Sequence, residues 1–351
     1  MRKQLLIAAV AATMSVAATA DISITGDAYI DFAKQKIGAA DTANTNHDSQ
    51  RTRLKVVGSA GGDAKVTAVV RNDGATRAND NDIDSSKKGL HMDSLYLTTK
   101  VGPVNVKVGD YWGTIGLGAR SLDAARSNAL SASTKVGDWK LGLFTADGSS
   151  DDGSDTTNVS ASGLLGPVSV GLVHNPGGFT NFTAKTTFNG ILFAVDKWND
   201  KRRNIIHNDT TLIHIGGKVN HFTWDLAQIK NDQASDMTDT SIVTNGKFAP
   251  LGSMLIGRSA RGGTATAVAD VSHFSEILGV AVSTKLAGNT VKAIYTKNTM
   301  FGDDKVTGTE LIVSRPLGGT TLTANIAKLS DVNTIVNGNA TNTGLRLDVK
   351  F

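Results

Sequence analysis

The sequence contains no cysteine, only five prolines and few aromatic residues, which make up 5% of the chain. The absence of cysteine excludes a disulfide framework, a thiolate metal site and a cysteine nucleophile. Because proline interrupts strand pairing, five prolines against 37 glycines favour many tight turns between strands. No apolar run is long enough to cross a bilayer as a helix. The sequence therefore predicts a chain of strands without covalent cross-links.

The first twenty residues have the pattern of an export signal. Arg2 and Lys3 give a positive start, residues 5–12 are apolar, and residues 18–20 (Ala-Thr-Ala) form a small-x-small cleavage site. We therefore expect residues 1–20 to be removed and the mature chain to start at Asp21. Removing Arg2 and Lys3 from the 36 basic residues leaves 34 against 32 acidic ones. This balance gives no reason to expect a nucleic-acid partner.

The last nine residues alternate strictly between two faces. One face carries Thr343, Leu345, Leu347, Val349 and Phe351, and the other carries Gly344, Arg346, Asp348 and Lys350. Side chains of a strand point alternately to its two sides, so this segment predicts a strand with an apolar and a charged face. Such a strand is either half-buried on a soluble core or separates lipid from water.

The same alternation recurs along the chain in pairs of strands joined by short turns. Most of these turns contain residues that tolerate positive φ or preset a turn. Longer stretches rich in Asp, Asn, Ser and Gly separate the pairs. With one strand at each end, nine turns predict about twenty strands in a single all-β domain, residues 21–351. The turns lie at 61–62, 102–103, 137–138, 166–167, 189–190, 220–221, 250–252, 288–289 and 318–319.

Strand after strand is polar on one face, with few bulky side chains to fill an interior. A closed wall of sixteen or more strands encloses a water channel, in which polar inner faces need no partner other than solvent. A soluble propeller would show a blade period of about forty residues, and no such period is present. The pattern therefore favours an up-and-down antiparallel barrel that crosses a membrane, with an even strand number.

One long connection, about residues 109–130, differs from the others because it is the least polar. It contains Trp112, Ile115, Leu117 and Leu122, which would expose apolar surface to water if the segment extended from the protein. We expect it to fold back onto the barrel. Residues 121–126 could form one short helical turn in which Asp123 and Arg126 pair.

Together these features resemble the Gram-negative general porins. The likeness covers the signal, the series of hairpins, the position of the third long loop and the terminal Phe351 preceded by Leu345, Leu347 and Val349. It implies sixteen strands, short periplasmic turns, long extracellular loops and a third loop folded into the lumen. It also implies a homotrimer in the bacterial outer membrane, surrounded by lipid and lipopolysaccharide, whose last residues are an assembly signal for the barrel assembly machinery.

The resemblance further implies a constriction in which loop acids face a bank of bases. By position, the constriction loop would contribute Asp110, Tyr111, Trp112, Arg120, Asp123 and Arg126, and the basic lumen wall would contribute Arg51, Arg53, Lys55, Lys65 and Arg71. A transverse field of this kind discriminates solutes by charge without binding them tightly. The excess of bases on the early strands favours a weak preference for anions.

Other chemistry finds little support in the sequence. The acidic stretch 80–85 lacks the central glycine of a calcium loop, His207, His214 and His221 recur at a spacing that suits no shared metal, and His273 with Ser275 supplies only part of a hydrolytic set. We therefore predict no enzyme activity, metal or cofactor. The sequence predicts a porin for passive diffusion of small hydrophilic solutes, with two alternatives: a substrate-specific channel for phosphate, sugar or another small anion, and a plugged structural or adhesive barrel.

Overall fold

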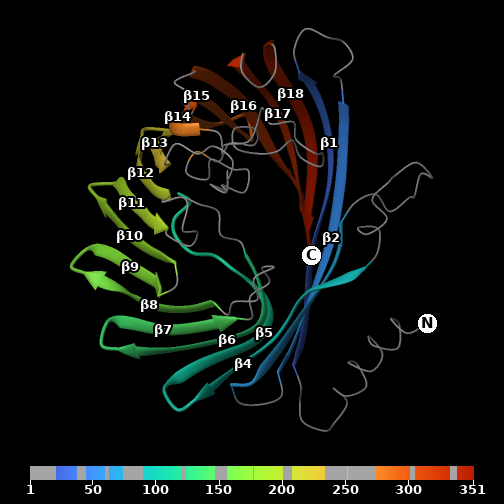
Figure 1. Ribbon diagram of the computed structural model, residues 1–351. Coiled ribbons are helices and arrows are strands. Elements are labelled where there is room, and N and C mark those ends of the chain that lie inside the picture. Colours follow the sequence, from blue (N-terminus) through green and yellow to red (C-terminus); the bar gives the residue numbers. More distant parts are fainter. Residues whose placement is uncertain are drawn as a thin grey trace.

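The computed structural model describes residues 21–37, 45–59, 63–73, 90–119, 124–146, 156–176, 178–200, 208–233, 251, 274–300, 305–332 and 338–351. The expected signal, residues 1–20, lies outside them. Within these ranges the chain forms eighteen strands (Figure 1), whose bounds are β1 Ile22–Ile37, β2 Thr45–Ser59, β3 Lys65–Asp73, β4 His91–Val101, β5 Val104–Gly113, β6 Ala124–Val136, β7 Trp139–Ala146, β8 Thr156–Leu165, β9 Val168–Asn175, β10 Phe179–Phe188, β11 Ile191–Asp200, β12 Asn208–Val219, β13 Phe222–Gln233, β14 Phe274–Leu286, β15 Asn289–Met300, β16 Lys305–Leu317, β17 Thr320–Val332 and β18 Gly338–Lys350.

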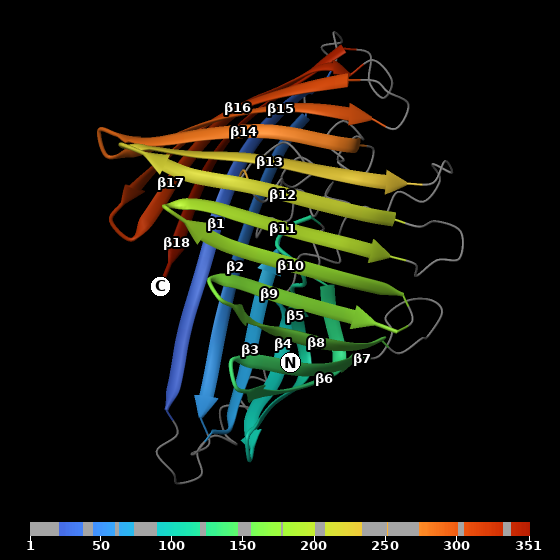
Figure 2. The same cartoon turned by 90° about the vertical axis from the view of Figure 1, so that its left-hand side faces the viewer.

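The strands form one closed antiparallel sheet. Each strand pairs with the next along the chain, and β1 pairs with both β2 and β18, so the barrel has no free edge. Figure 2 shows neighbouring strands joined by tight turns at one end of the barrel. The predicted all-β fold, the antiparallel order and the even number of strands are confirmed. No helix in the described part of the chain is long and apolar enough to span a bilayer.

The strand count lies between the two values expected. The sixteen strands implied by the porin resemblance are too few, and the twenty of the turn count are too many. The turn count was too high because it used residues 250–252, of which only Leu251 is described. β13 and β14 pair directly with each other, so no strand stands between them in the sheet.

Most of the predicted turns occupy their expected positions. Turns lie at 102–103, 137–138, 166–167, 189–190, 220–221 and 318–319, and the turn expected at 288–289 lies one residue earlier. Asn189 and Asn220 have positive φ values of 48° and 52°, a conformation that asparagine tolerates better than most residues. The connection between β9 and β10 spans only 176–178, so one connection at the loop end of the barrel is as short as a turn.

The outer face of the barrel carries an apolar band. On β1 the exposed apolar side chains are Ile22, Ile24, Ile30 and Phe32, so even-numbered residues point outward and odd-numbered residues point into the lumen. On β14 the outward positions run from Leu278 to Leu286, eight residue steps or about 27 Å along the strand. This length suits the apolar band of about 25 Å on barrels that cross a bilayer.

The last residue closes the seam of the barrel. The backbones of Phe351 and Gly26 exchange two hydrogen bonds, with N···O distances of 2.6 and 3.0 Å. Leu345, Leu347 and Phe351 are exposed on the outer face. The Phe351 ring lies over Gly26, where an added Cβ would be 2.5 Å from two ring carbons and 2.9 Å from the Arg53 carbonyl oxygen. Glycine is therefore required at position 26 by the close approach of the terminal ring.

A side chain at position 26 should destabilise the seam. Replacing Gly26 with valine should cost about 1–3 kcal/mol, because the new side chain overlaps both a ring and a backbone oxygen. The cost should fall when Phe351 is also replaced by alanine. The measurement is the temperature at which the refolded barrel stops migrating as the compact, folded species in gel electrophoresis. Ala28→Val, two residues along the same outward face, is the control, and equal melting of the two valine variants would contradict this account of Gly26.

Candidate functional site

The five expected wall bases all lie on the lumen side of β2 and β3. Arg53 is opposite both Asp27 on β1 and Arg71 on β3, and Lys55 is opposite Val69. These positions share the inward register, because their neighbours along each strand carry the outward apolar side chains. We call Arg51, Arg53, Lys55, Lys65 and Arg71 the basic wall.

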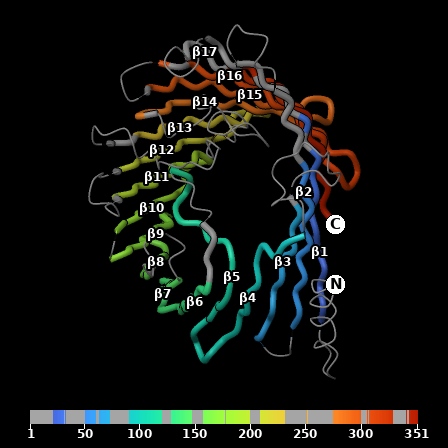
Figure 3. The backbone as a smooth tube through the Cα atoms, turned by 45° about the vertical axis from the view of Figure 1, so that its right-hand side comes forward, coloured from blue at the N-terminus to red at the C-terminus, as the bar shows by residue number. Residues whose placement is uncertain are grey.

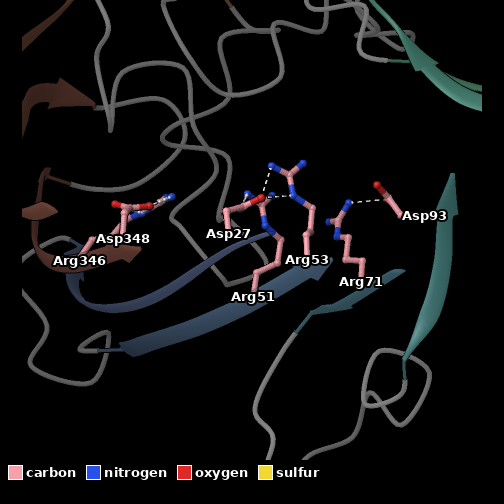
Figure 4. A network of polar contacts seen from close by, with 7 residues as sticks. All are labelled: Asp27, Arg51, Arg53, Arg71, Asp93, Arg346 and Asp348. Atoms are coloured by element: carbon pink, nitrogen blue, oxygen red, sulfur yellow. Dashed lines mark hydrogen bonds and ion pairs between the residues drawn. The ribbon is translucent and has the colours of Figure 1, made fainter. Parts of the chain in front are cut away.

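Ion pairs fix the arginines of the basic wall (Figure 4). Arg51 Nη2 and Arg53 Nε donate to the two oxygens of Asp27 at 3.3 and 2.8 Å, and Arg71 Nη1 donates to Asp93 at 3.0 Å. Among the described side chains, these three arginines pair with two carboxylates. A carboxylate that accepts from two guanidinium groups holds both side chains in one geometry. The arginines are therefore fixed in position while their summed charge stays positive.

The lysines of the basic wall increase this excess. Lys55 and Lys65 are exposed to the lumen, and among the residues that the structure describes neither forms an ion pair. Tyr29 contributes from β1, since its ring lies 4.9 Å from the Arg51 guanidinium carbon and 4.0 Å from that of Arg346. A cation over a ring face is attracted by the ring quadrupole. This side of the lumen is therefore a positive surface of ordered groups.

The chain that follows β5 crosses the lumen to the opposite wall. Figure 3 shows this segment running along the inside of the ring toward β11. The backbone N–H groups of Leu117, Gly118 and Ala119 donate to Asp196 Oδ2 on β11, at 2.6, 3.1 and 3.0 Å. Asn181 on β10 donates to the other oxygen at 2.6 Å. We call residues 114–119 the inserted loop, and its insertion confirms that the third loop folds into the lumen.

Asp196 is suited to this attachment by burial and by the shape of the loop. Its side chain is fully buried, and four N–H donors compensate for the water that a buried carboxylate loses. Gly116 and Gly118 have φ values of 85° and 117°, which turn successive N–H groups toward one point, as in an anion-binding nest. A Cβ on Gly116 would lie 2.7 Å from Asp196 Oδ2. The loop therefore fits closely around the carboxylate.

An aromatic cluster supports the base of the inserted loop. The ring of Tyr111 packs edge-on against Tyr96 and Phe144, with centroid distances of 5.8 and 6.5 Å. The Lys107 ammonium lies 3.9 Å from the Tyr96 centroid and 3.6 Å from that of Tyr111. Trp112 Nε1 donates to Asp93 at 3.1 Å, which links the loop base to the partner of Arg71. The cluster therefore couples the loop base to the basic wall.

The wall to which the loop is attached differs from the basic wall. Its lumen-facing side chains on β11–β16 include a set of large buried apolar residues, interspersed with polar and charged ones. Some of its charged groups are paired: His214 Nε2 lies 2.9 Å from Asp225, and Glu310 accepts from Asn325 at 3.2 Å. Lys218 and Lys285 are exposed to the lumen near the tight turns. This wall therefore combines a buried apolar set with positive charge near the tight turns. The buried apolar residues are Trp198, Leu212, Ile229, Ile277, Ile294 and Ile312.

The other predicted loop residues fall in different places. Asp110 Oδ1 accepts from the Asn128 backbone N–H at 2.8 Å, so Asp110 joins β5 to β6. Arg120 and Asp123 lie outside the described residues, as does the side chain of Arg126. The helical turn expected over 121–126 is wrong at its end, because β6 begins at Ala124.

The connection itself is shorter than expected, since β5 continues to Gly113 and β6 begins at Ala124. The register between these strands shifts where residues 127 and 128 of β6 face the single residue 110 of β5, and Asn128 has a φ of 47°. A β-bulge of this kind inserts one residue into β6 and reverses the alternation of its side chains. The start of β6 was therefore interpreted as loop in the sequence.

Sequence reasoning missed four residues of this site: Asp27, Lys107, Asn181 and Asp196. For Asp196 a signal was present. The lumen positions of β11 before and after it are Leu192, Ala194 and Trp198, so the acid is isolated on an otherwise apolar face. A lone carboxylate in such a position needs a partner.

Comparisons with known proteins support the fold. No family model matches the chain, and no curated protein matches it. Among solved structures, Acinetobacter baumannii OccAB3 has a TM-score of 0.61 at 11% identity, covering 94% of this chain and 100% of that one. Pseudomonas aeruginosa OpdK, solved with vanillate, has 0.60 at 11%, covering 94% and 98%. Pseudomonas aeruginosa OccK9 (OpdG) has 0.64 at 11%, with the same coverage. At this identity the likeness is one of fold, and the chain therefore has the fold of the porin-like outer-membrane β-barrels.

Proposed function

We propose that the protein is an outer-membrane channel that selects small hydrophilic anions, carboxylates above all. The observation that carries the proposal is the positive excess among the described side chains of the basic wall, where three arginines pair with Asp27 and Asp93 and two lysines add further positive charge. Fixed positive groups beside a water path raise the local concentration of anions. Guanidinium groups also match the planar geometry of a carboxylate.

Two further observations favour selection over general diffusion. The inserted loop is attached by three hydrogen bonds to Asp196, which hold it inside the lumen and narrow the path. One structure with the same fold was solved with vanillate, an aromatic carboxylate. The proposal is therefore the substrate-specific alternative of the sequence analysis in place of the general porin. The homotrimer, the assembly signal and the cleaved export signal stay predictions.

A pair of solutes of equal size tests the proposal. Benzoate and benzyl alcohol differ chiefly in charge, so the channel should pass benzoate much faster when the protein is reconstituted into liposomes of neutral lipid. The measurement is the rate of solute entry, with protein-free liposomes subtracted because benzyl alcohol also crosses lipid. Equal channel-dependent rates would contradict anion selection and support a general pore. A barrel that conducts neither solute nor ions in planar bilayers would support the plugged alternative.

A further inference from the structure

A row of polar residues crosses the outer face of the barrel from β11 to β16. The register places Lys197 opposite Thr211, Thr211 opposite Lys230, and Lys230 opposite Glu276. The row continues through Thr299 to Lys305. Lys297 lies on the same face, two residues closer than Thr299 to the tight turns, and is opposite Thr307. Lys328 lies opposite Thr309. We call Lys197, Lys230, Lys297, Lys305 and Lys328 the lysine patch.

The lysine patch faces away from the lumen. Its members share the outward register with large exposed apolar side chains: Phe193 on β11, Leu226 on β13, Tyr295 on β15 and Ile326 on β17. All five lysines are exposed. Each lies toward the strand end remote from the tight turns, the end that faces the cell exterior in outer-membrane barrels. The patch therefore lies at the border between the apolar band and the outer water.

The charges of the patch are available. Among the described residues, none of its lysines forms an ion pair, and Glu276, the acid in the row, accepts a hydrogen bond from Gln228. Lys197 and Lys230 are two strands apart, so their Cα atoms are separated by about 10 Å. Several ammonium groups at this spacing can bind one headgroup that carries more than one negative charge.

The patch is confined to one side of the barrel. On β3–β10, every lysine and arginine whose side chain is described lies in the inward register, as Lys65, Lys107 and Lys185 illustrate. A lysine beside the bilayer can extend its ammonium group to the water without a specific partner, but that behaviour would distribute lysines around the whole rim. Their absence from the described outward positions of β3–β10 therefore indicates a partner of opposite charge on the other side of the barrel.

We propose that the lysine patch is a docking site for the phosphate groups of lipopolysaccharide, the anionic glycolipid of the outer leaflet. The threonines between the lysines add hydroxyl donors to phosphate oxygens, and the outward apolar side chains below the row supply a surface for acyl chains. The inference rests on the proposed outer-membrane location. The lysines act outside the barrel, so they have no part in selection inside the lumen.

The test compares binding by the full refolded chain in detergent. The triple variant Lys197→Gln/Lys230→Gln/Lys297→Gln should bind lipopolysaccharide on the order of 100-fold more weakly than the parent, because each lysine near an anionic headgroup contributes about a factor of five. The control variant Lys140→Gln/Lys218→Gln/Lys285→Gln removes three lumen-facing lysines and should bind as the parent does. Dephosphorylated lipopolysaccharide should bind the parent as weakly as the triple variant binds the intact glycolipid.

Each other outcome overturns the proposal. Equal binding by the parent and the triple variant would remove the lysines from the site. Equal binding of the phosphorylated and dephosphorylated glycolipids would remove phosphate as the ligand. Equal, lysine-dependent binding of phosphatidylglycerol would show a general site for anionic lipid. Solute entry, measured on the same preparations, tests the proposed channel separately, since the triple variant should retain the parent's preference for benzoate over benzyl alcohol.

Discussion

Replacing Asp196 with alanine should detach the inserted loop from β11 and increase the single-channel conductance severalfold. The carboxylate accepts three backbone N–H groups of the loop and the amide of Asn181. Each hydrogen bond to a buried charged group contributes about 1.5–3 kcal/mol. The free energy lost with three such bonds therefore exceeds what hydrogen bonds to water could replace inside a closed contact. The loop should then leave the wall, and the narrowest part of the path should widen and fluctuate.

Two measurements on the same protein check this prediction. In planar bilayers the Asp196→Ala current should be larger and noisier than that of the parent. Hydrogen exchange at the amides of residues 117–119 should accelerate, because these amides lose their acceptor. Asp225→Ala is the matched control, since Asp225 is a lumen acid on β13 that contacts His214 and not the loop. Slow exchange at 117–119 in Asp196→Ala would show that other contacts hold the loop.

Asp196→Asn separates charge from shape. The asparagine oxygen can still accept hydrogen bonds from the loop, yet it carries no charge, and neutral hydrogen bonds are about half as strong as charge-assisted ones. The conductance of this variant should fall between those of the parent and the alanine variant. A conductance equal to that of the alanine variant would show that attachment of the loop requires the negative charge of Asp196.

The wall of the barrel was predictable from sequence because its physics is local. Water inside and apolar surroundings outside impose a period of two on every strand, and the last nine residues of the chain, which begin within β18, show that period. Turn residues such as Asn189 and Asn220 add a second local signal, positive φ. The number of strands was harder to predict, because a pattern of two faces does not reveal whether a segment pairs in the wall.

The strand that the inserted loop contacts could not be predicted in the same way. Its insertion followed from its apolar residues, but the anchor lies 77–79 positions further along the chain. The contact depends on the curvature of the whole barrel, which brings β11 opposite β5, and no local pattern encodes that distance. The bulge at residues 127–128 then concealed the start of β6. A lone acid between Ala194 and Trp198 was the available clue.

The two walls of the lumen contribute to selection in different ways. The inserted loop lies against β11 and is held there by Asp196. The solute path is thereby displaced toward β1–β4, where the arginines of the basic wall are held by Asp27 and Asp93. A narrow path along one charged side makes selectivity more sensitive to charge than a wide path of the same composition, because few ions pass beyond a Debye length from the wall.

Reversing the charge of Lys55 and Lys65 should therefore turn the channel from anion-selective to cation-selective. These lysines are exposed to the lumen, and within the described part of the chain they take no part in ion pairs, so their replacement leaves the arginine pairs intact. Lys55→Glu/Lys65→Glu changes the local charge by four units. At about 10 Å in water each unit changes the energy of a passing ion by about 0.4 kcal/mol, so the chloride-to-potassium permeability ratio should fall by at least tenfold.

The reversal potential under a gradient of potassium chloride measures this ratio. Lys230→Glu/Lys297→Glu is the control: it changes the net charge of the protein equally, but on the outer face, and its reversal potential should match that of the parent. The shift in the lumen variant should shrink as salt is raised from 0.1 to 1 M, where the Debye length falls from about 10 to 3 Å. An unchanged reversal potential at low salt would show that solutes do not pass beside Lys55 and Lys65, and selection by the basic wall would then be wrong.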